Sequence, residues 1–354
     1  MTQRRPTLDD VAEAVGVSRA TVSNAYNRPD QLSASLRTKV LRAAKRLGYT
    51  GPNPIARSLA RQRTGAIAFM LDTGLSAAFS DPALSITLDA FADTVDPEGH
   101  ALLLLPGGHN GGPRADRVLA AQADLAVAYS LADGAPALRA VRQRGLPLVV
   151  IDQPIVPGSA RVGIDDHGGA AAAARHLLEL GHRRFAILSA QCLSAPRGGP
   201  LTAQEAASSR FRDNRERLRG YLEALTNAGI DIRGVPIWET SGISREDAMA
   251  GASELLDREP TALLCMSDEL ALAALAIAKR RGIEVPGELS IVGFDGTPAA
   301  RWSEPVLTTV RQDLVRKGRV AGELALRLLA GERPPQQTLL DVELIVGAST
   351  APAR

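Results

Sequence analysis

Residues 7–27 read TLDDVAEAVGVSRATVSNAYN, and the pattern of these residues predicts the fold of the N-terminal part of the chain. Thr7 followed by Asp10 is the pattern of a capping box, with Asp in place of the usual Glu, so a helix is expected to begin there. Gly16 stands where this helix would end, because glycine adopts positive φ angles without a steric penalty. Ser18 can cap a second helix. The spacing therefore predicts two short helices joined by a tight turn.

A third helix is predicted between Ser33, a cap residue, and Gly48, with Leu36, Val40 and Leu47 at helical spacing between them. Three short helices around a small apolar core form the helix-turn-helix architecture. The second helix would then present an outward face of short or polar side chains, namely Arg19, Ala20, Thr21, Ser23 and Asn24. Such a face suits a helix in the major groove of DNA, although the solvated face of an ordinary surface helix looks the same.

Residues 53–60 read NPIARSLA and form a second candidate element for DNA binding. Asn53 can cap a helix, and Pro54 suits the first helical position. A helix this short is not stable alone in water, so we expect it to fold only against DNA or a partner chain. Leu59 would then be an apolar wedge for a minor-groove step, and an ordinary linker helix is the alternative.

The charge of the chain is unevenly distributed. The overall formal charge is +2, but residues 1–63 hold 12 Lys and Arg against four acidic residues, whereas the other 291 residues hold 29 basic and 35 acidic ones. A basic head on a larger acidic body indicates a polyanion-binding module joined to a domain with another role. A merely solvated basic surface would give the same counts.

Length and composition limit the class of protein. A chain of 354 residues exceeds one ordinary core, so about two or three domains are expected. Cys192 and Cys265 are the only cysteines and lie far apart in sequence, which argues against a disulfide framework and a zinc cluster. The sequence has no apolar run long enough to span a membrane and opens without a secretion signal, so a cytoplasmic location is expected.

From Gly65 onward, short apolar runs alternate with amphipathic stretches. The predicted strands are 66–71, 101–105, 125–129, 148–151, 185–188, 236–239, 262–266 and 289–294. The predicted helices include 168–180, 214–228, 245–257 and 268–281. This alternation is typical of parallel, doubly wound sheets, and its length exceeds one such unit. Two lobes are therefore expected, with a ligand between them at the carboxyl ends of the strands.

These features together resemble the lactose-repressor (LacI/GalR) family of bacterial transcription regulators. In the head, the resemblance is carried by TLDDVAEAVGVSRATVSN at 7–24, LGY at 47–49 and ARSL at 56–59. In the body, it is carried by FSDP at 79–82, RGLPLVVID at 144–152, VGIDD at 162–166, LGHRR at 180–184, SDELAL at 267–272, SIVGFD at 290–295 and LTTVRQD at 307–313. One departure is an extra residue in YTGP at 49–52, which lengthens the approach to the hinge.

The resemblance implies an α/β protein with a three-helix helix-turn-helix head and a hinge helix, followed by a two-lobed, doubly wound domain like the periplasmic binding proteins. The implied domains are a DNA-binding head at 1–50, a hinge at 51–64 and an effector-binding and dimerisation domain at 65–354. The implied lobes are 65–160 with 291–313, and 161–290 with 314–345. With Leu59 as the intercalating hinge residue, the implied DNA-binding residues are Thr7, Ser18, Arg19, Ala20, Thr21, Ser23, Asn24, Asn27, Tyr49, Ala56 and Leu59.

The resemblance also suggests ligand-binding residues. Asp295 matches the acidic residue that binds ligand hydroxyls in the family. An arginine that precedes the Gly-Tyr pair at 220–221 matches the arginine that reaches the cleft, and both Arg215 and Arg217 are candidates. Asp268 could contact the ligand, but it could equally cap the helix that follows it.

Three further residues are weaker candidates. Ser80 and Asp81 could line the cleft, but Ser-Asp-Pro also suits the start of a helix. Asp166 is expected to be a helix cap rather than a ligand contact. The stretch 191–210 is longer than the loops of the family, and its Pro, Gly and Ser content predicts a mobile polar flap near the cleft.

Three other functions fit the sequence less well. An enzyme is disfavoured, because the five histidines have no metal-binding spacing and neither a nucleophile elbow nor a dinucleotide fingerprint occurs. A pure small-molecule binding protein would not need a basic head, and an architectural DNA protein would not need the long C-terminal body. The resulting prediction is a homodimeric repressor that binds a palindromic double-stranded DNA operator and senses a small-molecule effector, a sugar or else a nucleoside, without a metal or other cofactor.

Overall fold

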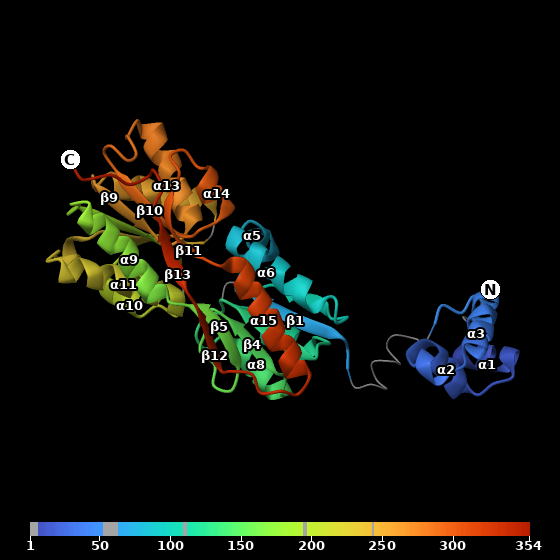
Figure 1. Cartoon of the computed structure of the whole chain (residues 1–354). Coiled ribbons are helices and arrows are strands. Elements are labelled where there is room, and N and C mark those ends of the chain that lie inside the picture. Colours follow the sequence, from blue (N-terminus) through green and yellow to red (C-terminus); the bar gives the residue numbers. More distant parts are fainter. Residues whose placement is uncertain (1–5, 52–62, 109–111, 194–196, 243) are drawn as a thin grey trace. The chain divides into compact units, whose positions relative to one another are not determined.

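The computed structural model describes residues 6–51, 63–108, 112–193, 197–242 and 244–354. The contacts divide the chain into two compact units, one that ends at Gly65 and one that begins at Ala66 (Figure 1). Most of the predicted hinge, including Ala56 and Leu59, lies outside the described residues. Across the described part of the chain, no helix is long and apolar enough to cross a membrane.

The described residues of the N-terminal unit form three helices and one short 3-10 turn, α1 (Leu8–Val15), α2 (Arg19–Asn27), η1 (Pro29–Gln31) and α3 (Ala34–Leu47). The predicted capping box is confirmed, because Thr7 and Asp10 bond reciprocally at the start of α1. Ser18 and Ser33 cap α2 and α3 as expected, each by accepting a backbone N–H with its hydroxyl. Local capping chemistry therefore sets the boundaries of all three helices.

The core of this unit is small and built from one face of each helix. Its fully buried members are Val11, Ala12, Val15, Val22, Ala25, Val40, Ala43 and Ala44. Tyr26 and Tyr49 meet edge to face at its border, with ring centroids 6.0 Å apart. This arrangement confirms the three-helix head and leaves the opposite face of α2 toward solvent.

The C-terminal unit contains two sheets, and the first is entirely parallel. Its strand order is β12-β5-β4-β3-β1-β2, with β1 (Ala66–Leu71), β2 (Ala101–Leu105), β3 (Leu125–Tyr129), β4 (Leu148–Ile151), β5 (Ala160–Ile164) and β12 (Gln337–Leu340). The helices of this lobe are α5 (Leu75–Phe79), α6 (Pro82–Val95), α7 (Ala115–Ala120), α8 (Pro136–Arg144) and α15 (Leu314–Leu329). Alternate residues of β1 join different core clusters, because successive side chains of a strand point to opposite faces of the sheet.

The second sheet is parallel except at its two edge strands. Its order is β13-β11-β10-β9-β6-β8-β7, with β6 (Phe185–Ser189), β7 (Gly199–Leu201), β8 (Ile237–Glu239), β9 (Ala262–Cys265), β10 (Ser290–Asp295), β11 (Thr308–Gln312) and β13 (Val342–Ile345). The edge strands β7 and β13 pair antiparallel with their neighbours. The remaining elements of this lobe are α9 (Asp166–Glu179), α10 (Ala203–Ala207), α11 (Arg212–Asn227), η2 (Ile232–Gly234), α12 (Arg245–Leu256), α13 (Asp268–Arg281) and α14 (Pro298–Trp302).

The predicted composition of the two lobes is wrong for three segments. Residues 291–313 were expected in the first lobe, but β10 pairs with β9, and β11 pairs with β10, in the second sheet. Residues 161–164 and 314–340 were expected in the second lobe, but β5, α15 and β12 belong to the first. The chain therefore crosses between the lobes three times, at the ends of β5, β11 and β12.

The packing of α15 gives the physical reason for this correction. In Figure 1, α15 (red) lies beside α6 (cyan) rather than against the second sheet. A Cβ atom at Gly318 would lie 2.2 Å from the carbonyl oxygen of Thr87, and one at Gly322 would lie 2.6 Å from the Cβ of Thr94. Two glycines one turn apart thus allow α15 to approach α6 closely, which places α15 in the first lobe.

The described residues of the stretch 191–210, where a mobile polar flap was predicted, include regular secondary structure. These elements are the edge strand β7 and the helix α10. The buried carboxylate of Glu239 accepts the backbone N–H groups of Cys192 and Leu193 at 3.0 Å and that of Arg197 at 3.3 Å. The described part of this loop is therefore anchored to the end of β8.

Candidate functional site

The outward face of α2 carries the predicted groove-contacting residues. Ser18, Arg19 and Ala20 are exposed, and the Arg19 side chain is 71% exposed with its Nε 3.8 Å from Asp9. The Ser18 and Thr21 hydroxyls lie 2.8 Å apart. An exposed arginine with only a long, solvated contact can leave it for a stronger partner at little cost.

Other predicted DNA contacts are held by neighbours within the head. Asn27 Nδ2 donates to Ser23 Oγ at 3.2 Å, and Asn24 Nδ2 donates to Gln31 Oε1 at 3.4 Å. These bonds orient the side chains of Asn24 and Asn27. The amide oxygen of Asn24 takes no part in the contact with Gln31. Thr7 is bonded within the capping box, and its contact with DNA stays a prediction.

The C-terminal unit contains a cluster of buried polar side chains where the carboxyl ends of strands from both sheets meet. We name it the interlobe cluster, and its members are Asp152, Gln153, Arg161, Asp166, Asp213, Arg217, Asp295, Gln312 and Lys317. Parallel strands place their carboxyl ends at one edge of a sheet, and ligands of doubly wound proteins bind at such edges. Charged groups are buried in proteins only when they are paired or serve a function.

Arg217 on α11 is the centre of the part contributed by the second lobe. Its Nε donates to Asp166 Oδ1 at 2.9 Å, and its Nη1 lies 3.5 Å from Asp295 Oδ1. The guanidinium carbon lies 3.7 Å from the centroid of the Phe294 ring, a cation–π geometry. Burial lowers the pKa of Arg217, but the surrounding carboxylates outweigh burial and hold that pKa above its ordinary value. The arginine is therefore firmly positive and rigidly placed.

A chain of hydrogen bonds links Asp295 to the first lobe. Gln312 at the end of β11 donates through Nε2 to Asp295 Oδ1 at 2.7 Å. Its Oε1 accepts from Lys317 Nζ, which also bonds Asp152 Oδ1 at 2.6 Å. Burial raises the pKa of Asp295 to about 8, and Arg217 opposes that shift. The cluster thus joins both lobes across the crossover between β11 and α15.

Asp166 does not have the role predicted for it. The cap of α9 is Asp165, whose side chain accepts the N–H of Gly168, whereas Asp166 occupies the first helical turn. Asp166 is only 2% exposed and forms the ion pair with Arg217. The prediction of a helix cap was wrong because the two adjacent aspartates are indistinguishable as caps by sequence, and the chain enters the helix one residue earlier than expected.

The structure also separates the two candidate arginines. Arg217 is in the interlobe cluster, whereas Arg215 bonds the carbonyl of Ser209 and lies 3.3 Å from Asp133 Oδ2. Asp133 also accepts both Nε and Nη2 of Arg210 through its carbonyl oxygen. Because Asp133 belongs to the first lobe, Arg210 and Arg215 bond from the second lobe to the first. Neither arginine is a member of the interlobe cluster.

Asp268 is neither the cap of α13 nor part of the cluster. Ser267 caps α13, and Asp268 accepts Thr309 Oγ1 at 2.5 Å and the N–H of Thr297 at 2.6 Å. Burial raises the pKa of Asp268 to about 6, although these hydrogen bonds lower it. The carboxylate therefore fixes the loop that follows Asp295.

Asp81 has the helix-start role that was given as its alternative, whereas Ser80 ends α5, and the ligand contacts of both residues stay predictions. The exposed Ser80 donates its hydroxyl to the carbonyl of Ser76 at 3.0 Å. Asp81 caps α6 by accepting the N–H groups of Ala83 and Leu84 at 2.9 and 3.2 Å. Burial raises the pKa of Asp81, and Lys317 is among the charges that oppose this shift, so Asp81 lies within electrostatic reach of the cluster.

Asp72 follows β1 and is coupled to Asp81. Burial, and then the charge of Asp81, raise the pKa of Asp72 to about 7. The folded state therefore binds more protons than the unfolded state between about pH 4 and pH 7, so the contribution of Asp72 to stability falls as the pH rises through this window.

Asp72→Asn should therefore stabilise the protein above pH 7 by about 1–2 kcal/mol, after allowance for partial exposure, and should have almost no effect near pH 4. Thermal unfolding of the full chain at both pH values measures the difference. Asp89→Asn, on the exposed face of α6, is the matched control and should show no such pH-dependent gain. Equal effects of Asp72→Asn at pH 4 and pH 8 would contradict the assignment.

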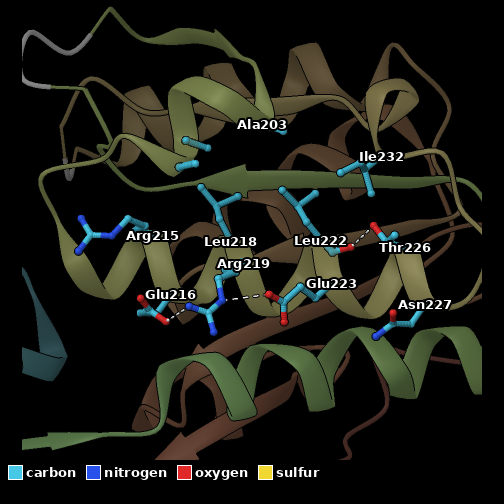
Figure 2. A pocket seen from close by; sticks show the side chains of 12 residues that line it. Ala203, Arg215, Glu216, Leu218, Arg219, Leu222, Glu223, Thr226, Asn227 and Ile232 are labelled. Carbon is cyan, nitrogen blue, oxygen red and sulfur yellow. Dashed lines mark hydrogen bonds and ion pairs between the residues drawn. The ribbon is translucent and has the colours of Figure 1, made fainter.

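Two surface hollows of the C-terminal unit lie apart from the interlobe cluster. One, of about 360 Å³, is bounded by α10, α11 and η2. Figure 2 shows Leu218 and Leu222 at its floor, and Arg219 between its partners Glu216 and Glu223. The other, of about 910 Å³, follows the β7–β8 edge of the second sheet. The interlobe cluster lines neither hollow, and among the described residues there is no group of His, Cys, Asp and Glu side chains placed to hold a metal ion.

Six members of the cluster were not predicted from the sequence, namely Asp152, Gln153, Arg161, Asp213, Gln312 and Lys317. Asp152 directly follows a predicted strand, which is a usable signal for a residue at the edge of a sheet. Gln312 lies in a stretch that carries the family resemblance. Lys317, Arg161 and Asp213 have no local pattern that distinguishes them from surface residues, because their burial depends on contacts between distant segments.

The chain matches two family models, bacterial regulatory proteins of the lacI family over residues 7–53 and the periplasmic binding protein-like domain over residues 174–350. An HTH-type transcriptional regulator of Mycolicibacterium smegmatis is 41% identical over 359 residues, which cover 99% of this chain and 97% of the relative. The structure is similar to that of the lac repressor dimer bound to operator and the anti-inducer ONPF, with 26% identity, a TM-score of 0.79 and coverage of 98% and 100% of the two chains.

It is also similar to a complex of the transcriptional regulator CelR with cellobiose, with 29% identity, a TM-score of 0.70 and coverage of 98% and 100%. A helix-turn-helix head joined to a two-lobed α/β body defines a class of DNA-binding transcription regulators. This chain belongs to the lacI family of bacterial regulatory proteins within that class, as the resemblance of its sequence implied.

Proposed function

We propose that this protein is a cytoplasmic, homodimeric repressor that binds a palindromic operator and changes its DNA affinity when a sugar binds at the interlobe cluster. The observation that carries this proposal is the presence, in one lacI-family chain, of an exposed polar face on α2 and a buried charged cluster shared by two lobes. A nucleoside effector is the alternative. The complex of CelR with cellobiose supports the choice of a sugar by analogy.

For DNA binding, we propose that α2 lies in the major groove with Arg19, Ala20 and Asn24 toward the base edges. Arginine donates two hydrogen bonds to guanine, and asparagine pairs with adenine in the same way. Ser18, Thr21, Ser23 and Asn27 would contact phosphates or adjacent base edges. In the same proposal Tyr49 and Ala56 contact the backbone and Leu59 enters a minor-groove step.

For assembly, we propose a twofold symmetric dimer, because a palindromic operator repeats the same half-site in both directions. Exposed apolar side chains of the second lobe support such pairing. Trp302 is 85% exposed, Val346 is 60% exposed and Val306 is 44% exposed. The N–H of Ala348 bonds the carbonyl of Val306 at 2.7 Å, which places the segment after Val346 beside Val306. An apolar surface of this kind is typical of an interface.

For regulation, we propose that the effector changes the relative position of the lobes and, through the hinge, the affinity for the operator. Any factor by which the effector changes operator affinity must equal the factor by which the operator changes effector affinity. Fluorescence anisotropy on an operator selected from random DNA, with and without candidate sugars and nucleosides, tests the proposal. Operator affinity that does not respond to any of these compounds would contradict it.

Arg19→Ala is expected to weaken specific operator binding by roughly 10- to 100-fold and to relax base preference at one position of each half-site. The reason is that a base contact, unlike a phosphate contact, carries sequence information. Anisotropy titrations against the selected operator and single-base variants measure both effects. Arg142→Ala, an exposed arginine of α8, is the control for loss of positive charge and should leave operator affinity unchanged. An equal loss on all DNA sequences would show that Arg19 contacts phosphate only.

A further inference from the structure

The larger of the two hollows, of about 910 Å³, is a groove along the β7–β8 edge of the second sheet. Its lining residues come from four segments that are distant in sequence, 183–185, 200–204, 230–238 and 254–260. We infer that this groove, named here the basic groove, is a binding site for a small organic phosphate. This inference goes beyond the proposed function and does not depend on it.

The basic groove and the interlobe cluster lie at opposite ends of the second sheet. Phe185 and Ile237, which line the groove, are the first residues of β6 and β8, whereas Asp295 of the cluster is the last residue of β10. Because β6, β8, β9 and β10 run parallel, their amino ends share one edge of the sheet and their carboxyl ends share the other. A ligand in the groove would therefore not lie between the lobes.

The groove is positively charged, although the body of the protein is acidic. Four arginines and two acidic residues line it, which gives a net formal charge of +2; they are Arg183, Arg184, Arg233, Arg258, Asp231 and Glu254. In the sequence after residue 63, by contrast, 35 acidic residues outnumber 29 basic ones. A phosphate monoester carries a charge of about −1.5 to −2 at neutral pH, so its charge complements that of the groove.

Two of these arginines have guanidinium groups that are free to bind a ligand. Arg184 and Arg258 are exposed, and neither side chain has a hydrogen bond or ion pair with the described residues. Arg233 is held by Asp231 in a fork with two bonds of 3.0 Å, and Arg183 donates to two backbone carbonyls. A guanidinium without a carboxylate partner offers donors in a planar arrangement that fits phosphate oxygens.

The pairing of β6 with β9 brings the two free arginines to the same end of the groove. Phe185 lies opposite Ala262 in the register of these strands, and the carbonyl of Arg184 accepts the N–H of Thr261 at 2.9 Å. Arg258 precedes Thr261 by three residues, in the turn that leads from α12 to β9. Donors from two segments, 74 residues apart in sequence, thus border one end of the groove.

The groove also has an apolar wall that suits the organic part of such a ligand. Leu201, Val235 and Leu255 line it beside the half-buried Trp238. The indole of Trp238 packs against Gly251, where an added Cβ would lie 2.6 Å from the indole Cδ1, so this wall is fixed by close packing. The volume of the groove is within the range of about 300–1,000 Å³ that is usual for small-molecule sites. Inorganic phosphate would leave the apolar wall uncovered, so an ester with a carbon body should bind more tightly.

Isothermal titration calorimetry on the full chain tests the inference with phenyl phosphate, AMP and glucose 6-phosphate. Their neutral counterparts phenol, adenosine and glucose, together with inorganic phosphate and a hexaglutamate peptide, are the contrasting probes. We expect at least one organic phosphate to bind saturably, and at least roughly tenfold more tightly than both its neutral counterpart and inorganic phosphate.

Three outcomes of this titration would overturn the inference. They are the absence of saturable binding by any organic phosphate, equal affinity for inorganic phosphate, and tighter binding of hexaglutamate, which would instead indicate an acidic protein segment as the occupant. Operator DNA takes no part in the titration, so failure of the proposed function and failure of the groove site are distinguishable.

The variants Arg184→Gln and Arg258→Gln locate the site. Each should lower the affinity for the organic phosphate roughly tenfold, because each removes a charged hydrogen-bond donor. The melting temperature should not change, since both side chains are exposed and unbonded.

Arg280→Gln is the matched control, because Arg280 is an exposed arginine of α13 that does not line the groove. It removes the same charge and should leave the affinity unchanged. An equal loss in this control would show attraction to the overall charge only. Unchanged affinity in both groove variants would place the phosphate elsewhere in the protein, and either result would overturn the inference.

Discussion

Replacing Lys317 with methionine is expected to lower the free energy of unfolding of the protein by about 3–5 kcal/mol, the largest stability effect anticipated for a single substitution in this chain. Lys317 is 1% exposed, and its Nζ bonds Asp152 Oδ1 at 2.6 Å and Gln312 Oε1. Removing the ammonium group leaves the Asp152 carboxylate buried without its charge partner, and the cost is that of an uncompensated charge rather than of one lost hydrogen bond.

Urea unfolding of the full chain, followed by circular dichroism, measures this effect. Arg327→Met is the matched control on the same helix, because Arg327 pairs with Glu332 at 2.8 Å while both side chains are about half exposed. An exposed pair of this kind contributes about 0–1 kcal/mol. A loss in Lys317→Met no larger than in the control would mean that water reaches Asp152 and that the pair is not buried in solution.

Replacing Arg217 with lysine is expected to abolish the effector response while the protein stays folded and binds its operator. The substitution keeps the positive charge but removes the planar group that bonds Asp166, the carbonyl of Met266 and the region of Asp295 at once. Lysine is a point charge and cannot reproduce this geometry or the contact with Phe294. We expect at least a tenfold loss of effector affinity.

Operator affinity with and without a sugar that binds the wild-type chain measures this response. Arg219→Lys is a control two residues away on α11, where Arg219 is 57% exposed and paired with Glu216 and Glu223 (Figure 2). That variant should respond like the wild type. A normal response in Arg217→Lys would remove the guanidinium from the effector site.

The coupling between the lobes follows from how the cluster is distributed. Arg217 and Asp295 belong to the second lobe, Lys317 belongs to the first, and Gln312 lies at the crossover between them. A ligand that competes for any of these bonds changes the equilibrium between arrangements of the two lobes. A conformational response requires that the ligand bind one arrangement more tightly than the other. The basic head alone would bind DNA with a strong dependence on salt concentration. In the proposed function, the body makes DNA binding depend on the effector as well.

Much of the head could be predicted from its sequence. The capping residues Thr7, Ser18 and Ser33 begin the three helices as expected, and Gly16 and Gly48 end two of them in the left-handed conformation. Such boundaries depend on contacts within about one turn of the chain, so a local pattern is sufficient. Most interior strands were predicted equally well from their apolar runs. The interior strands β5 and β11 were missed because polar residues interrupt their apolar runs, and the edge strands β7, β12 and β13 were missed as well.

Much less of the candidate site than of the head could be predicted from the sequence. Asp295 and Arg217 were named from the family resemblance, and the structure places both in one ion-paired group. The choice between Arg215 and Arg217 was open, because both lie on the same helix and only the packing of α11 against α9 turns Arg217 toward Asp166. Arg161, Asp213 and Lys317 were absent from the prediction altogether.

Local sequence patterns were sufficient to predict a three-helix head and a doubly wound body, because caps, turns and apolar periodicity act over a few residues. The distribution of strands between the lobes and of charges in the buried site depends on contacts between distant segments. Those outcomes depend on the three crossovers and on the approach of α15 to α6 through Gly318 and Gly322. Lys317 and Asp152 are 165 residues apart in sequence, and no local pattern records that they will meet.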